Sequence, residues 1–224
     1  MESIYRMSNA MNSMIKKNAA EMHVDLEKAR KEASKKEKDK HLTLMQIVKK
    51  YDYPIERHLY TTEDHYTNTV FRINGPRGTT AEENARSNKK KPIILYQHGL
   101  LDSAAGICCD GLNSMAFFFA DQGFDVWMNN NRGNRHSKFH KYLDPEHDAE
   151  FWDFSFYEFG KYDQPALIDY ILKTTGVPDL SYIGHSQGTS QILSALAENA
   201  EWFRSRVNVF MLLAPVARVD RCSA

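Results

Sequence analysis

The sequence has few cysteines and no long apolar run, and each absence excludes a class of protein. Two of its three cysteines, Cys108 and Cys109, are adjacent, and because a bridge between chain neighbours is strained we expect thiols rather than a disulfide framework. The longest apolar runs, such as Met115 to Ala120, are far too short to span a bilayer. The N-terminus carries Glu2 and Arg6 and lacks the uninterrupted apolar core of a secretory signal.

An excess of one charge is also missing, with 29 lysines and arginines against 29 aspartates and glutamates. No long-range field therefore attracts a polyanion, and we expect no nucleic-acid partner. What the chain does contain is the apolar content of an ordinary globular protein, 42% of its residues. Its 224 residues are enough for one domain with a substantial core, together with appendages.

Residues 1–43 differ in composition from the rest of the chain. They include a run from Glu27 to Lys40 that is almost pure charge and alanine, which predicts a solvated helix or a disordered arm. A partner-binding amphipathic helix is the alternative, suggested by the weak three-then-four spacing of Ile4, Met7, Met11 and Met14. No second stretch repeats that spacing, and we favour the solvated or disordered arm.

From residue 44 the pattern is that of a folded region. Residues 44–75 predict a short helix and a β-hairpin, and residues 76–224 predict alternating strands and helices, with polar loops at 77–91 and 129–154. We expect the lysines of the first loop to be solvated. The expected strands are Glu56–Thr61, Tyr66–Ile73, Ile93–Gln97, Phe124–Met128, Leu180–Ile183 and Val207–Leu213.

The expected helices complete an α/β pattern. They are Leu44–Val48, Met115–Asp121, a helix between Asp163 and Gly176, and Thr189–Asn199. Strands that alternate with helices require a mostly parallel sheet with right-handed crossovers and helices on both faces. The antiparallel hairpin is expected to extend one edge of that sheet.

The sequence Gly184-His185-Ser186-Gln187-Gly188 follows an expected strand and precedes an expected helix. In this context a G-x-S-x-G sequence presents a nucleophilic serine on a sharp turn. The serine is forced into a sparsely populated backbone conformation, and Gly184 and Gly188 leave room where a Cβ would collide with neighbouring elements. We therefore predict Ser186 as a nucleophile. A glycine-flanked serine in an ordinary turn is the alternative.

A second motif, Gln97-His98-Gly99-Leu100-Leu101, stands at the end of the strand that precedes it. Ester hydrolysis passes through a tetrahedral oxyanion, which needs preplaced backbone N–H donors. One donor belongs to the residue after the nucleophile, here Gln187, and the other to this loop, where Leu100 is the candidate. We expect His98 and Gly99 to have a structural role beside the site. Catalysis by His98 as a base is the alternative.

Several motifs, in their order and spacing, resemble the acid lipases, the family of gastric and lysosomal lipases and cholesteryl esterases. They are His98-Gly99-Leu100-Leu101, Asp125-Val126-Trp127, Asn131-Arg132-Gly133-Asn134, Glu150-Phe151-Trp152, Phe154-Ser155-Phe156, Lys161-Tyr162-Asp163, Gly184-His185-Ser186-Gln187-Gly188 and Ala214-Pro215-Val216-Ala217. The resemblance covers about residues 44 to 219. It includes a likeness of Tyr53 to Thr61, with Thr62-Glu63-Asp64, to the short N-terminal lipase segment of that family.

The resemblance implies an α/β-hydrolase fold and hydrolysis of apolar carboxylic esters, such as triacylglycerols or sterol esters, with no cofactor or metal. It makes Ser186 the nucleophile and Leu100 and Gln187 the oxyanion donors. The family is usually secreted or lysosomal. This chain departs from the family in lacking the usual signal, in its arm before residue 44, and at His65, which replaces a turn glycine and which can tolerate positive φ.

The serine needs a histidine base held by a carboxylate, and in this fold both follow the serine along the chain. All nine histidines stand at or before His185, and the only acids after the serine are Glu198, Glu201 and Asp220. We therefore expect a truncated or incomplete form that stops before the cap and the last strands. Such a form should hydrolyse no ester above a Ser186→Ala control.

Two further explanations stay open. The chain could be a short, non-catalytic relative that acts as a lipid-binding or interaction module, or it could borrow His136 or His140 as an unorthodox base. A metal site in the loop at 129–154 is not expected, because its candidate ligands lack a spacing that makes them converge. Those ligands are His136, His140, Asp144, Glu146, His147 and Asp148.

Overall fold

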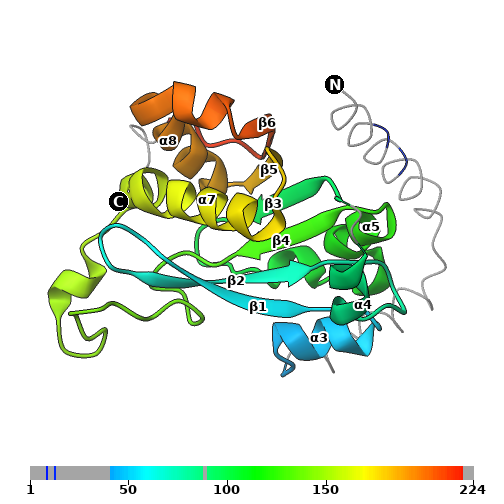
Figure 1. The fold of residues 1–224 in the computed structure, drawn as a ribbon. Coiled ribbons are helices and arrows are strands. Elements are labelled where there is room, and N and C mark those ends of the chain that lie inside the picture. The colour runs from blue at the N-terminus through cyan, green and yellow to red at the C-terminus, as the bar shows by residue number, and fades with distance from the viewer. Residues whose placement is uncertain (1–8, 10–12, 14–40, 88–89, 219–224) are drawn as a thin grey trace.

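Short runs rich in β-branched and aromatic residues form a six-stranded sheet in the computed structural model, which describes residues 9, 13, 41–87 and 90–218 (Figure 1). The strands are β1 (Glu56–Thr61), β2 (Thr67–Ile73), β3 (Ile93–Gln97), β4 (Asp125–Asn129), β5 (Leu180–His185) and β6 (Val207–Leu213). Nearly all of the arm predicted at 1–43 lies outside the described residues.

The strand order β1-β2-β4-β3-β5-β6 confirms the predicted α/β architecture. The hairpin β1-β2 pairs with β4 in the antiparallel direction, and β4, β3, β5 and β6 are parallel to one another. The hairpin therefore extends one edge of the sheet, as expected. His65 stands in its turn with φ of 74°, so the predicted tolerance of a positive φ is also confirmed.

Helices cover both faces of this sheet (Figure 1). They are α3 (Leu44–Lys50), α4 (Ala81–Arg86), α5 (Met115–Asp121), α6 (Phe156–Glu158), α7 (Gln164–Thr175) and α8 (Gln187–Arg204). One hydrophobic cluster joins α3 and α5 to the sheet face that carries Ile94 and Val126. A second joins α7 and α8 to the opposite face, which carries Leu95 and Trp127. The alternation along each strand thus separates two cores.

Local signals explain the ends of the main helices. Helix α7 has proline in its first turn and ends at Gly176, whose φ is 66°, so the predicted stop at this glycine is confirmed. Helix α8 begins two residues before its predicted start and continues past its predicted end. The backbone leaves helical geometry at Asn199, with φ of −152° and ψ of 69°, and the helix resumes as far as Arg204.

The loop predicted at 77–91 was wrong in two respects. Helix α4 forms within it, because the Thr80 hydroxyl accepts from the Glu83 N–H and the Glu83 carboxylate accepts from the Thr80 N–H in a capping box. Two of its lysines are not simply solvated: Lys90 Nζ donates to the carbonyl of Gly176, and Lys91 Nζ donates to Asn84 Oδ1 at 3.0 Å. The Lys90 bond connects the segment to the C-terminal end of α7, and the Lys91 bond connects the end of the segment to α4.

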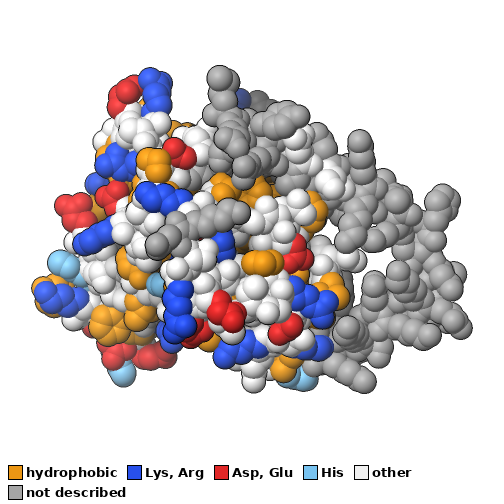
Figure 2. All heavy atoms as spheres, turned by 45° about the vertical axis from the view of Figure 1, so that its right-hand side comes forward, with side chains coloured by type: hydrophobic (Ala, Val, Ile, Leu, Met, Phe, Trp, Pro, Cys, Tyr) orange, Lys and Arg blue, Asp and Glu red, His pale blue; other side chains and the backbone are white. Residues whose placement is uncertain are grey.

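The surface carries charges of both signs. On the face shown in Figure 2, basic and acidic side chains are interspersed among the described residues, with no large region of one sign. Within the described part of the chain, no helix combines the length and apolar content needed to cross a membrane.

Trp127 offers a test of the core. Its side chain is fully buried beneath the rings of His58 and Tyr170 and the guanidinium of Arg72. We expect Trp127→Ala to lower the free energy of unfolding by about 3–5 kcal/mol, because the cavity collapses only partly. Trp152→Ala, the same change at a side chain that is 44% exposed, should cost about 1 kcal/mol. Urea denaturation measures both, and equal losses would contradict the described packing.

Candidate functional site

Ser186 occupies the turn between β5 and α8 in a strained conformation, with φ of 52° and ψ of −119°. Hydrogen bonds hold the turn on both sides. The Ser186 N–H donates to the carbonyl of Leu213 on β6 at 2.9 Å, and its carbonyl accepts from the N–H and hydroxyl of Thr189 at 2.9 and 2.6 Å. A non-glycine residue at this positive φ persists only because the surrounding bonds determine it.

The turn needs close approach of two backbones. A Cβ added to Gly188 would lie 2.6 Å from the carbonyl oxygen of Gln97 and 3.0 Å from that of His98. Only glycine therefore allows the first turn of α8 to rest directly on the end of β3.

The loop after β3 lies against Ser186 because of strand register. Gln97 on β3 pairs with Gly184 on β5, so the second residues beyond them, Gly99 and Ser186, come side by side. A Cβ built on Gly99 would stand 3.0 Å from Ser186 Cβ. The structure therefore brings the predicted loop and the predicted serine to the same end of the sheet.

Gln187 and Leu100 stand on either side of this contact. Gln187 is the first residue of α8, so its N–H belongs to the first turn of the helix, whose donors have no partner within the helix and carry the positive end of its dipole. Leu100 exposes 66% of its surface, and Leu101 exposes 99% with φ of 58°. Both predicted donors thus belong to backbone segments next to Ser186.

A pocket of about 290 Å³ opens beside these residues. Leu100 and Gln187 line it together with His98 and Gly99, and aromatic side chains form its apolar wall. The aromatic lining residues are Trp152, Phe154, Phe156 and Phe159. This lining suits an apolar group attached to a polar reacting centre.

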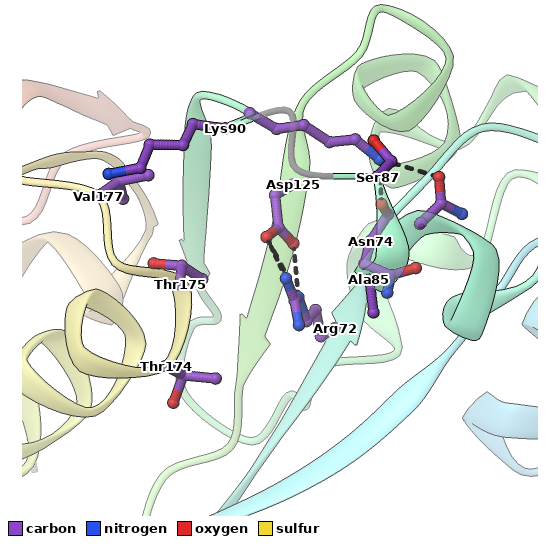
Figure 3. A pocket seen from close by; sticks show the side chains of 11 residues that line it. Arg72, Asn74, Ala85, Ser87, Lys90, Asp125, Thr174, Thr175 and Val177 are labelled. Carbon is purple, nitrogen blue, oxygen red and sulfur yellow. Dashed lines mark hydrogen bonds and ion pairs between the residues drawn. The ribbon is translucent and has the colours of Figure 1, made fainter.

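A somewhat larger cavity, about 330 Å³, is lined by Lys90 and Asp125 near the amino ends of β3 and β4 (Figure 3). Ser186 follows the carboxyl end of β5, so this cavity lies at the other end of the parallel strands. Its charges already have partners. Arg72 donates to both carboxylate oxygens of Asp125, with Nη2 to Oδ2 at 2.7 Å. Because Arg72 and Asp125 are already paired with each other, the larger volume does not make this cavity the better candidate site.

Both ring nitrogens of His98 are engaged by backbone groups. Nδ1 donates to the carbonyl of Gly99 at 2.7 Å, and Nε2 accepts from the N–H of Asn131 at 3.2 Å. Burial lowers the pKa of His98, because a charged ring would lose solvation, although the Gly99 carbonyl and Asp102 oppose this shift. A neutral ring with both nitrogens occupied suits a structural role and is unsuited to taking a proton from Ser186.

The two histidines considered as substitute bases are placed differently. His140 Nε2 donates to the carbonyl of Asp64, and Nδ1 accepts from the N–H groups of Tyr142 and Leu143, so neither nitrogen is free. His136 Nε2 accepts from Arg135, and burial and that guanidinium lower the pKa of His136. Among the described residues, the Ser186 hydroxyl makes no hydrogen bond to any histidine.

A network of buried amides lies beneath the site, and sequence reasoning missed it. Gln97 Oε1 accepts from Asn129 at 2.8 Å and from Gln164 at 3.0 Å. Gln97 Nε2 donates to Asn131 at 2.8 Å, and Gln164 Nε2 donates to Gln191 at 3.1 Å. The polar residues at the ends of the buried strands β3 and β4 were the signal, since buried polar groups need partners.

An ion cluster next to this network was also missed. The side chain of Arg132 is 1% exposed and donates to two carboxylates, Asp163 Oδ1 at 2.6 Å and Asp64 Oδ1 at 2.9 Å. Burial raises the pKa of Asp163 to about 6, although Arg132 acts against this shift. Burial also raises the pKa of Asp64, but hydrogen bonds from Arg132 and Thr62 outweigh it and hold that pKa below its usual value. One guanidinium thus serves two carboxylates, and the pKa is raised at Asp163, the more deeply buried of the two.

The described residues contain no cluster of three or more histidine, cysteine, aspartate or glutamate side chains that could hold a metal ion.

Comparison with known proteins gives two family matches. A model described as a partial alpha/beta-hydrolase lipase region matches residues 44–111, and one described as the alpha/beta hydrolase fold matches residues 92–223.

Several relatives that match are lipases. Lipase 1 of Drosophila melanogaster is 41% identical over 178 residues, which cover 79% of this chain and 37% of that protein. The lysosomal acid lipase/cholesteryl ester hydrolase of Macaca fascicularis is also 41% identical, with 82% of this chain and 44% of that protein covered. For the gastric triacylglycerol lipase of Homo sapiens the identity is 41%, and the shares are 80% and 43%. The chain spans less than half the length of each of these relatives.

The burial of His98 predicts a pH effect on stability. Its folded pKa is depressed, so the unfolded chain binds this proton more readily and stability should fall as pH drops through the ordinary histidine range, from about 7.5 to about 5. His98→Gln, which stays neutral, should show a smaller fall in melting temperature than the unchanged chain over that range. Thermal denaturation at several pH values measures the difference. Identical pH slopes would mean that His98 is not held neutral.

Proposed function

The chain belongs to the α/β-hydrolase fold family and carries its partial lipase region, and from this premise we propose that it supplies the nucleophile and oxyanion site of a serine hydrolase for apolar carboxylic esters. The resemblance to acid lipases drawn from the sequence is confirmed by these matches and by the lipase relatives. Triacylglycerols and sterol esters are the proposed substrate class, because the names of two relatives specify them.

The observation that carries the proposal is the contact between the Ser186 turn and the Gly99 loop. Two segments far apart in the sequence meet there, and a hypothetical Gly99 Cβ would reach within 3.0 Å of Ser186 Cβ. One segment brings the serine and the N–H of Gln187, which as the first residue of α8 has no acceptor within the helix, and the other brings the N–H of Leu100. This is the set of groups that acyl transfer requires on the nucleophile side.

The proposed chemistry follows from these positions. Ser186 Oγ attacks the ester carbonyl carbon, the carbonyl electron pair moves onto oxygen, and the N–H groups of Gln187 and Leu100 stabilise the resulting oxyanion. Collapse of this intermediate expels the alcohol and leaves an acyl group on Ser186. The hydroxyl proton must pass to a base, and the sequence has no histidine after Ser186. An apolar acyl chain would lie along the aromatic wall of the pocket.

A non-catalytic lipid-binding module is the second candidate. Leu100 and Leu101 expose 66% and 99% of their surfaces, and Trp152 exposes 44%, so apolar surface surrounds the pocket. Binding of a fatty acyl ligand that is unchanged by Ser186→Ala, without acyl transfer in any variant, would favour this reading.

A thiol in place of the serine tests the site without needing a base. Ser186→Cys puts a nucleophile at the N-terminus of α8, where the helix dipole favours the thiolate. We expect a long-chain p-nitrophenyl ester to acylate this variant about 100-fold faster than Ser194→Cys, since one oxyanion donor alone contributes about 10²–10³ in rate. Ser194 is a partly exposed serine on the same helix and so provides a matched control.

Both variants are made with Cys109→Ser and Cys222→Ser, because Cys109 is exposed and Cys222 is a third thiol of the sequence that could react with the same reagents. Alkylation by iodoacetamide, which forms no oxyanion, corrects each rate for the intrinsic reactivity of its thiol. Equal corrected rates would contradict an oxyanion site at Ser186.

The unchanged chain gives a complementary expectation. Without a histidine base, the 224-residue chain should hydrolyse a long-chain ester no faster than Ser186→Ala, since loss of the base costs about 10⁶-fold in a serine triad. Release of p-nitrophenol measures both. Rapid turnover that depends on Ser186 would show that another group serves as the base.

A further inference from the structure

The cluster around Arg132 joins three elements that lie far apart in the sequence. Asp64 belongs to the turn of the β1-β2 hairpin, Arg132 to the loop after β4, and Asp163 to the turn just before α7. The guanidinium uses Nε and Nη2 on Asp163 and both Nη groups on Asp64, and its face lies 3.9 Å from the ring centroid of Tyr66. Arginine presents its donors in a rigid fork, so this arrangement fixes the orientation of the residue.

Asn131 directly precedes Arg132 in the sequence and connects the ion cluster to the site by hydrogen bonds. Its N–H donates to His98 Nε2 at 3.2 Å, and its side-chain oxygen accepts from Gln97 at 2.8 Å. Both bonds connect the loop after β4 to the end of β3. A displacement of Arg132 would therefore move the donor that holds the imidazole of His98.

His98 in turn fixes a peptide group. Its Nδ1 donates to the carbonyl of Gly99 at 2.7 Å, and that carbonyl shares one planar peptide with the N–H of Leu100. The described residues contain no cis peptide bond, so this C=O and N–H point in opposite directions. A hydrogen bond that fixes the direction of the Gly99 carbonyl therefore also fixes the direction of the Leu100 N–H.

We propose that Arg132 is a positioning residue, which sets the direction of the Leu100 N–H through Asn131 and His98. The inference rests on the proposed function, because it assumes that this N–H stabilises an oxyanion. Arg132 touches no reacting atom in this scheme. Its effect is confined to steps that form an oxyanion at Ser186.

The Ser186→Cys protein with Cys109→Ser and Cys222→Ser provides the readout. Acylation by the p-nitrophenyl ester needs the oxyanion site, and alkylation by iodoacetamide does not. The ratio of the acylation rate to the alkylation rate therefore reports whether the Leu100 N–H points toward the oxyanion. Arg132→Lys keeps the charge but loses the fork, and we expect it to lower this ratio about 10-fold or more. A purely structural role would lower both rates together or neither.

Two more variants accompany Arg132→Lys. Asp64→Asn removes one carboxylate at a residue whose side chain is 26% exposed, and it should fold even if Arg132→Lys does not. It should lower the ratio by a smaller factor, about 3-fold, because Asp163 still holds the guanidinium. Arg135→Lys makes the same change at an exposed arginine of the same loop and should leave the ratio unchanged.

The outcomes separate this inference from the proposed function. If the Ser186→Cys parent shows no advantage over Ser194→Cys in ester acylation, the proposed function fails. If the parent shows the advantage and folded Arg132→Lys keeps the full ratio, only the role of Arg132 is overturned. If Arg132→Lys does not fold, a full ratio in Asp64→Asn overturns it as well.

Discussion

Polar side chains buried at the carboxyl ends of the parallel strands impose the constraint on which the rest of the structure depends. A strand end inside a protein must satisfy every polar group it buries, and each unpaired group costs about 1–3 kcal/mol. Gln97 and Asn129 are fully buried, and they meet this requirement through each other and through neighbouring side chains. Gln164 is also fully buried; its Nε2 donates to Gln97, whereas its Oε1 has no hydrogen-bond partner among the described residues. The ends of β3 and β4 and the start of α7 are therefore fixed relative to each other by hydrogen bonds as well as by apolar packing.

The buried amides also bear on how α8 packs against the sheet. Gly188 lets the first turn of the helix approach the carbonyl of Gln97, and a Cβ on Gly160 would lie 2.7 Å from the carbonyl of Gln191. Close approach at both glycines brings the Gln191 amide to that of Gln164. The strain at Ser186 is held in place by this packing on one side and by the bond to Leu213 on the other.

Local pattern predicted most of the fold and the placement of the serine. The bounds of β1, β3, β6 and α5 agree with the sequence prediction, because each is a compact run with clear breakers on both sides. The sequence could not predict the partners of Arg132, which lie 68 and 31 residues away at Asp64 and Asp163. Polar pairing across such distances leaves no periodicity, and only the fold brings the groups together. Helix α4 was missed for a different reason, since a short helix held by its cap has no apolar face.

The groups that the proposed chemistry needs differ in whether they belong to the backbone or to a side chain. The turn at Ser186, the first N–H of α8 and the peptide between Gly99 and Leu100 are all backbone features, and strand register and buried amides fix the backbone. A base, in contrast, is a side chain that must reach the serine hydroxyl from another part of the fold. The proposed nucleophile and oxyanion donors can therefore be in place even though no histidine among the described residues bonds to the serine hydroxyl. Under the proposed function, the backbone geometry near Ser186 would determine which bond is attacked, and turnover would depend on a base that this geometry does not include.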